Sequence, residues 1–181
     1  MTEMNTSRVG EDLEKCVQAL ICGPMFPFSV GLHHSLPVAA HGVYTIWKQI
    51  QFLYVGIAGR KLDLGIHHVR MRGLKDRLDS HWKGRRSGDQ FAVYVFDRFI
   101  APTLTDEQRT LFATGQLEGD SLTRSFIQQY LSYRFVPTPS YKQAITIETY
   151  LARGESPAGL PLLNARRRKT SEKKGTFSNE G

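Results

Sequence analysis

Two short tripeptides each place a tyrosine two residues from a glycine. Gly-Val-Tyr occupies residues 42–44 and Tyr-Val-Gly occupies residues 54–56, so Tyr44 and Tyr54 are ten residues apart. If the two segments pair as strands, both phenol groups belong to one small sheet. A phenol can give or accept a proton, although free tyrosine, with a pKa of about 10, is a poor base at neutral pH.

Three further polar residues follow in an order that could complete a site. Arg77 and His81 are spaced i, i+4 within a segment predicted as a helix, so their side chains share one face. Glu148 lies midway along a later predicted helix, among apolar neighbours, and Asn164 comes after that helix. A guanidinium is a permanent, forked donor for phosphate oxygens, and a carboxylate is a ligand for hard cations.

This ordered set of motifs resembles the GIY-YIG nuclease family over residues 42–164. Val43 and Val55 stand where the family name has isoleucine, a change that keeps a β-branched side chain. The link between Gly56 and Arg77 is longer than the usual one, which indicates an inserted loop. The resemblance implies a metal-dependent endonuclease that hydrolyses DNA phosphodiester bonds.

The resemblance also implies a role for each residue. Glu148 would be the single protein ligand of Mg²⁺ or Mn²⁺, and Arg77 would contact the scissile phosphate. Tyr44 would accept the proton of the attacking water, provided that Arg77 and the metal lower its pKa. The remaining members would position phosphate and water, share the proton transfer or give hydrogen-bonding support: Tyr54, His81 and Asn164.

Each role has an ordinary alternative. The two tyrosines could pack a sheet as strand aromatics. Arg77 could be a solvated helix charge, and His81 could interact with a helix C-terminus. Glu148 could be an exposed helix residue, which is the usual place of a glutamate.

The predicted Arg77 helix is bracketed by more basic than acidic residues, a pattern that suits sequence-independent contacts to nucleic-acid phosphates. The whole chain has 24 Lys and Arg against 17 Asp and Glu, a net charge of +7. Residues 165–181 hold six basic and two acidic side chains, so we expect a disordered basic tail there. The expected partner is double-stranded DNA, and the candidate phosphate-contacting residues are Arg60, Lys61, Arg72, Lys75, Arg85 and Arg86.

Composition excludes several other classes. No segment approaches the roughly 18 apolar residues of a membrane-spanning helix. The first 15 residues are acidic and lack the apolar centre of an export signal. Cys16 and Cys22 are too few for a disulfide framework or a four-cysteine zinc site, and their six-residue spacing does not favour a mutual bridge. We therefore expect a reduced, cytoplasmic protein.

Hydrophobic periodicity and capping signals predict a mixed fold of the α/β (α+β) class, in which helices flank a small antiparallel sheet of about three strands. Residues 1–40 are expected to form an N-terminal helix and loop extension, and residues 41–164 the nuclease-like domain. The predicted strands are 42–47, 52–57 and 91–99, with an extended segment at 134–138. The predicted helices are 11–21 and 73–83, one from Thr105, one from Asp120 or Ser121, and one from Ser140 to Gly154.

The size of the nuclease-like domain favours a restriction-type or stand-alone endonuclease, and a homodimer is compatible with that class. Two alternatives stay open from the sequence. One is a nucleic-acid-binding protein that keeps the fold without catalysis, and the other is an endonuclease for structured RNA.

Overall fold

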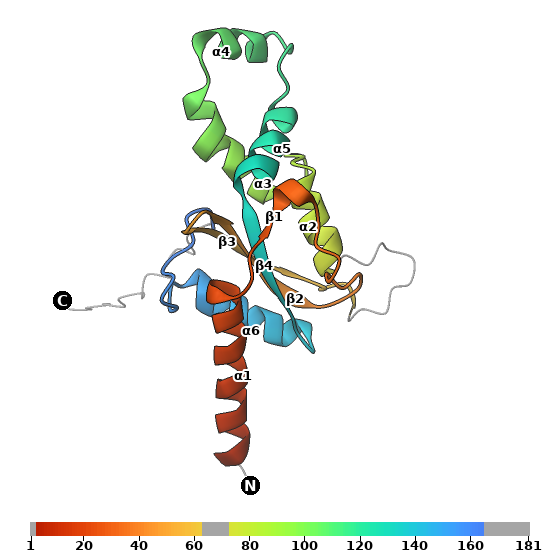
Figure 1. The fold of residues 1–181 in the computed structure, drawn as a ribbon, viewed down its shortest axis with the longest axis vertical. Helices are drawn as coiled ribbons and strands as arrows, with labels where there is room; N and C mark the ends of the chain where they lie inside the picture. Colours follow the sequence, from red (N-terminus) through yellow and green to blue (C-terminus); the bar gives the residue numbers. More distant parts are fainter. Residues whose placement is uncertain (1–2, 63–72, 165–181) are drawn as a thin grey trace, which may run out of the picture.

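The computed structural model describes residues 3–62 and 73–164, and side chains from residue 11 onward. Its centre is a four-stranded antiparallel sheet with the order β1-β4-β2-β3. The strands are β1 (Phe26–Pro27), β2 (Gly42–Lys48), β3 (Gln51–Ala58) and β4 (Ser132–Pro137). Helices flank this sheet (Figure 1), which confirms the predicted fold class, with four strands in place of about three.

The β2–β3 hairpin fixes the position of both tyrosines. Tyr44 pairs with Gly56 and Ile46 pairs with Tyr54, so these residues share one face of the sheet. The register shifts between Ile46 and Trp47, which marks a β-bulge near the two-residue turn. The predicted hairpin is therefore confirmed.

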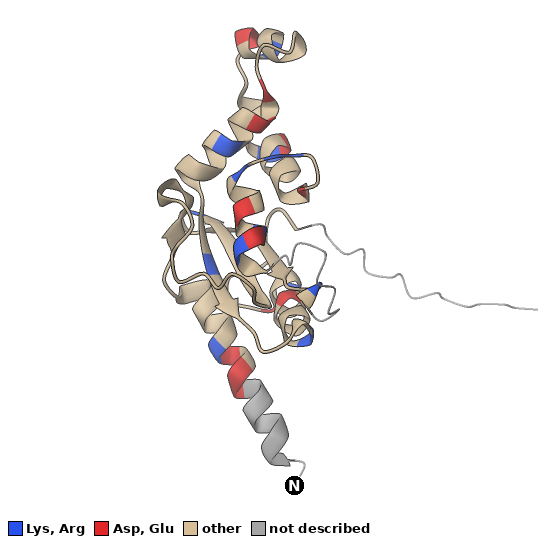
Figure 2. Ribbon diagram, turned by 90° about the vertical axis from the view of Figure 1, so that its right-hand side faces the viewer, with Lys and Arg blue, Asp and Glu red and all other residues tan. Residues whose placement is uncertain are grey.

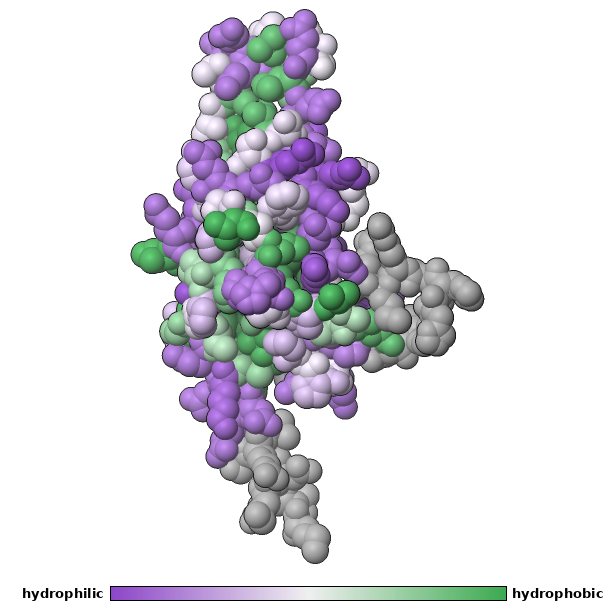
Figure 3. All heavy atoms as spheres, turned by 45° about the vertical axis from the view of Figure 1, so that its right-hand side comes forward, coloured by the Kyte–Doolittle hydropathy of each residue, from purple (hydrophilic) through white to green (hydrophobic). Residues whose placement is uncertain are grey.

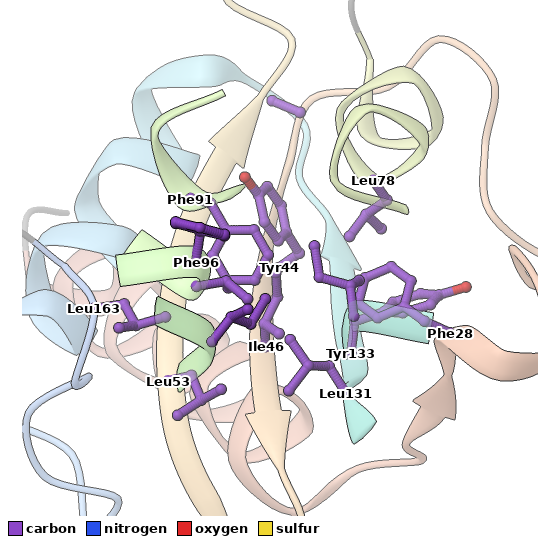
Figure 4. Close-up of a cluster of buried hydrophobic side chains, with 14 of the residues drawn as sticks. Phe28, Tyr44, Ile46, Leu53, Leu78, Phe91, Phe96, Leu131, Tyr133 and Leu163 are labelled. Atoms are coloured by element: carbon purple, nitrogen blue, oxygen red, sulfur yellow. The ribbon is translucent and has the colours of Figure 1, made fainter. Parts of the chain in front are cut away.

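The face of the sheet that carries Tyr44 is covered by helices from the middle of the chain. They are α2 (Leu74–Trp82), α3 (Gln90–Val95) with its π-helical continuation (Phe96–Ile100), and α5 (Gly119–Tyr130). Together with the sheet they enclose the larger hydrophobic cluster. Figure 4 shows Tyr44 among the aromatic and aliphatic side chains of this cluster.

The opposite face packs against the two ends of the described chain. Helix α1 (Glu3–Cys22) and helix α6 (Tyr141–Ala152) cover Val43, Trp47 and Val55 in a second hydrophobic cluster. Residues before position 41 also supply strand β1, which pairs with β4. The described part of the N-terminal segment thus belongs to the same sheet and core as the rest.

Local capping signals placed the starts of two helices correctly, and a third helix begins close to its predicted position. Helix α4 (Asp106–Ala113) begins after Thr105 with a reciprocal capping box to Gln108. Helix α6 begins after Ser140, whose hydroxyl accepts the backbone N–H of Gln143. Helix α5 begins at Gly119, one residue before the earliest predicted position.

Helix α4 and its connections form the projecting end of the molecule, where apolar residues lie among polar ones (Figures 1 and 3).

One predicted strand is wrong. Residues 91–99, rich in aromatic and β-branched residues, are helical. Phe91, Ala92, Val95 and Phe96 are buried, at the i, i+1, i+4, i+5 spacing of a helix face that packs into the larger cluster.

Among the described residues, no helix is long and apolar enough to cross a membrane.

Candidate active site

The site is built around the hydroxyl of Tyr44. This side chain has no exposed surface, and its ring lies over Gly56, the residue opposite it on β3. The ring can lie flat across the neighbouring strand because glycine has no Cβ there. Gly42 lies too close to Leu74 and the Val136 carbonyl to carry a side chain. Close packing therefore explains why both tripeptides contain a glycine.

Helix α2 brings two polar side chains to that hydroxyl. Leu74 and Leu78 are fully buried and hold the helix against the sheet. The same orientation directs Arg77 and His81, as the i, i+4 spacing predicted, toward Tyr44. The Nε–H of Arg77 donates to the Tyr44 oxygen at 3.3 Å, and His81 Nε2 lies 2.8 Å from that oxygen.

A buried aspartate that sequence reasoning missed continues the network. Asp89 Oδ2 lies 2.6 Å from His81 Nδ1, and its Oδ1 accepts the backbone N–H of Phe91 at 3.2 Å as the N-cap of α3. His81 is 0% and Asp89 2% exposed. The only sequence signal was a capping aspartate before residue 90, and the predicted strand at 91–99 obscured it.

Burial dominates the electrostatics of the tyrosines. It raises the pKa of Tyr44 well above the ordinary value of a phenol, and the nearby Tyr54 adds to the increase, while the Arg77 guanidinium acts in the opposite direction. Arg77 thus acts as the sequence analysis expected, but it does not lower the net pKa of Tyr44. The phenol is neutral in this structure.

The charges around Tyr44 are well defined. Burial opposes the charge of Arg77, but the phenols of Tyr44 and Tyr54 and the carboxylate of Asp89 outweigh it and raise the pKa of the guanidinium. Burial lowers the pKa of His81 despite its contact with Asp89, so the imidazole is neutral at pH 7. Burial opposes the charge of Asp89 too, but the His81 hydrogen bond and the charge of Arg77 lower its pKa and keep it ionised.

Tyr54 lies beside Tyr44 on the same face of the sheet. Tyr54 is partly buried, its ring centroid lies 6.3 Å from that of Tyr44, and it meets His81 edge-on. Burial raises the pKa of Tyr54, Arg77 lowers it, and the charge of Glu148 is near enough to add to the increase. Helix α6 packs against β3 and holds the half-buried Glu148 near this tyrosine. Helix α6 covers the face of the sheet opposite Tyr44, so the structure places the charge of Glu148 near the hairpin, and its approach to Arg77 stays a prediction.

Asn164 supports the sheet beside the site. Its Oδ1 accepts the backbone N–H of Val55 and its Nδ2 donates to the Val55 carbonyl, both at 2.8 Å. Leu162 and Leu163 also bond to the backbone of β3. This segment covers the outer edge of β3 from Phe52 to Val55, so Asn164 supports the strand that carries Tyr54.

The predicted phosphate-contacting residues differ in their surroundings. Arg60, Lys61, Lys75 and Arg85 are exposed. Arg86 is partly engaged: its Nε donates to Asp120 at 2.9 Å and its guanidinium lies over the Phe96 ring at 4.4 Å. Arg72, residues 63–72 of the link in which an inserted loop was predicted, and the predicted tail over 165–181 lie outside the described residues. Basic and acidic positions are interspersed along the ribbon (Figure 2).

Glu148 is the single candidate metal ligand that the sequence analysis assigned to this site. Within residues 3–62 and 73–164, no group of three or more His, Cys, Asp or Glu side chains comes together to hold an ion. Magnesium commonly binds through one or two carboxylates, with water and substrate phosphate as its other ligands, which fits Glu148. Cys16 and Cys22 are both free, as expected.

Comparisons with models of known protein families, with curated proteins and with solved structures give no match to this chain.

Proposed function

We propose that the chain is a metal-dependent endonuclease of the GIY-YIG type, which hydrolyses phosphodiester bonds of double-stranded DNA. The observation that carries the proposal is the meeting of the hairpin and α2 at the Tyr44 hydroxyl, with the charge of a third segment, α6, acting on the neighbouring Tyr54. The hairpin supplies Tyr44 and Tyr54, α2 supplies Arg77 and His81, and the charge of α6 residue Glu148 is felt at Tyr54. A guanidinium and an imidazole around one buried phenol form a polar network of the kind that is common at functional sites.

The proposed division of labour follows from burial. Arg77 and Tyr54 are partly exposed and can contact an incoming phosphate, and Glu148 is partly exposed on α6, whereas Tyr44 and His81 are buried. Arg77 would contact the phosphate and stabilise the charge that develops on it in the transition state. Glu148 would hold Mg²⁺, which supplies further positive charge beside the phosphate. Tyr44, in contact with Arg77 and His81, would guide the proton of the attacking water.

The exposed cations support a nucleic-acid substrate. Arg60 and Lys61 follow β3, Lys75 lies on α2 and Arg85 follows α2, and these two elements carry Tyr54 and Arg77. Contacts from such residues to phosphates are largely independent of sequence and weaken as salt is added. We accordingly propose that they hold the duplex against the site, and that the protein acts in the reducing cytoplasm.

One observation favours a second candidate function. Tyr44 has no surface open to bulk solvent, so a reactant must be admitted past the partly exposed residues before this hydroxyl can act. A nucleic-acid-binding protein that keeps the fold without catalysis would have no need of such access.

The two candidates are separated by incubating the full chain with supercoiled plasmid, and with a structured RNA, in Mg²⁺, Mn²⁺ or EDTA. The endonuclease proposal predicts nicked or linear plasmid with either metal and intact plasmid in EDTA. Binding without cleavage in all three conditions would favour the non-catalytic alternative, and cleavage of RNA alone would change the substrate class.

A further inference from the structure

The hydrogen bonds from Arg77 to Asp89 have a defined direction. Arg77 Nε always carries a hydrogen and donates to the Tyr44 oxygen at 3.3 Å. At the other end, the Asp89 carboxylate is ionised and can only accept, so the Nδ1 of His81 must donate to it across 2.6 Å. The donor and the acceptor are therefore known for the first hydrogen bond, from Arg77 to Tyr44, and for the last, from His81 to Asp89.

The direction of the middle bond follows. A neutral imidazole carries one N–H, and because that hydrogen is on Nδ1, the Nε2 atom of His81 has a free electron pair. The contact of 2.8 Å between Nε2 and the Tyr44 oxygen is then a bond in which Tyr44 donates. Every hydrogen in the series therefore points from Arg77 toward Asp89.

We infer that Asp89 is a positioning residue of this site, which holds His81 in the tautomer whose bare Nε2 can receive the proton of Tyr44. The inference rests on the proposed hydrolytic function. The raised pKa of Tyr44 supports it, since a phenol in this environment does not ionise on its own. A proton acceptor in direct contact removes the need for a free phenolate.

The proton transfer balances as follows. As the oxygen of water forms its bond to phosphorus, that water gives a proton to the Tyr44 oxygen, and Tyr44 gives its own proton to His81 Nε2. The electron pair of the broken P–O bond leaves with the departing oxygen, which takes a proton from solvent. His81 becomes an imidazolium paired with the Asp89 carboxylate, and it returns the proton through Tyr44 to solvent after the product leaves.

Asp89 has two roles: its carboxylate caps helix α3 and it bonds to His81 Nδ1. One substitution separates these two roles. Asp89→Asn keeps an oxygen that can accept the Phe91 N–H, and asparagine is as good an N-cap as aspartate. Its amide group, however, would donate to Nδ1 and move the ring hydrogen of His81 to Nε2. That hydrogen would then face Tyr44, and the imidazole could no longer accept a proton from it.

The tautomer can be read directly by long-range ¹H–¹⁵N NMR of the histidine-labelled full chain, with the signal of His81 identified by its loss in His81→Asn. We expect the Nδ1–H tautomer in the wild type and the Nε2–H tautomer in Asp89→Asn. We also expect kcat for plasmid cleavage to fall about 10²- to 10⁴-fold in that variant, the range for a displaced acid–base group, with KM little changed.

Asp79→Asn is the matched control, because Asp79 lies on the same helix and pairs with Lys83 on the surface. It should change neither the tautomer nor the rate. An Nε2–H tautomer in the wild type, or normal cleavage by an Asp89→Asn protein whose tautomer has switched, would overturn this inference alone. A wild-type protein that has the Nδ1–H tautomer but cleaves nothing would overturn the proposed function.

Discussion

The hydroxyl oxygen of Tyr44 lies directly over Gly56, its partner on the neighbouring strand. A Cβ added to Gly56 would stand 2.2 Å from that oxygen and 2.5 Å from Cζ of the same ring. The second glycine is thus needed for the orientation of a buried tyrosine whose hydroxyl contacts Arg77 and His81. The two tripeptides form one structural unit.

The first prediction follows from this contact. Gly56→Ala should displace the Tyr44 ring, cost about 1–3 kcal/mol in the free energy of unfolding, as overpacking does, and remove most cleavage activity. Chemical denaturation and a plasmid assay measure the two effects. Unchanged stability together with unchanged activity would show that Tyr44 does not occupy the space over Gly56.

Tyr44→Phe tests the hydroxyl separately from the ring. The variant keeps the packing but leaves buried hydrogen-bonding atoms of Arg77 and His81 without their partner, so we expect a loss of roughly 1–3 kcal/mol in stability. Cleavage should be abolished. Tyr133→Phe is the control, because Tyr133 is equally buried and its hydroxyl accepts the His33 N–H at 2.7 Å. That variant should lose stability and keep its activity. Equal cleavage by both variants would remove Tyr44 from the mechanism.

Arg77→Lys tests whether the fork of the guanidinium matters. Lysine keeps the positive charge but cannot donate to Tyr44 and a phosphate in the same planar geometry. We expect kcat to fall about 10²-fold or more with little change in DNA affinity, the scale for losing one positioned donor. Lys75→Ala, which removes an exposed cation of the same helix, should weaken binding slightly and leave kcat unchanged. If Arg77→Lys instead weakened DNA binding and left kcat unchanged, Arg77 would be only a surface contact to DNA.

Stability should depend on pH through His81. Burial lowers its pKa in the folded protein below the ordinary 6.5, so the unfolded chain takes up a proton first as pH falls. This contribution to stability is complete above about pH 6.5 and is lost as acidification continues toward the lower folded pKa. The free energy of unfolding should therefore decrease between about pH 7.5 and pH 5.5.

His81→Asn should flatten that pH dependence, whatever its effect on absolute stability. His34→Asn changes an exposed histidine and should leave the slope unchanged. Equal slopes for the wild type and both variants would contradict the burial of a neutral His81.

Local signals in the sequence were sufficient for much of this fold. The capping residues Thr105 and Ser140 mark helix starts because their hydroxyls bond to backbone N–H groups three residues away. The i, i+4 spacing of Arg77 and His81 likewise fixes a shared helix face from adjacent turns alone. These features depend on neighbours in the chain and can be read without knowledge of the fold.

Other features depend on contacts that local patterns do not contain. The segment 91–99 has a strand-like composition, yet its burial against the sheet requires a helix, so tertiary packing outweighs propensity. Asp89 was missed for a related reason: it reaches His81 only because the turn between α2 and α3 brings the two together. The burial that raises the pKa of Tyr44 is likewise a property of the whole core.

The most direct test of the account is plasmid cleavage by Glu148→Gln in Mg²⁺, beside Glu155→Gln as a matched control. Glu155 is exposed and lies 3.7 Å from Arg153 just beyond the end of α6, so its change should have no effect. Glu148→Gln removes a ligand charge and little volume, and we predict that it binds DNA but does not cleave it. Cleavage by Glu148→Gln at the wild-type rate would contradict the claim that α6 supplies the metal-binding carboxylate of a hydrolytic site.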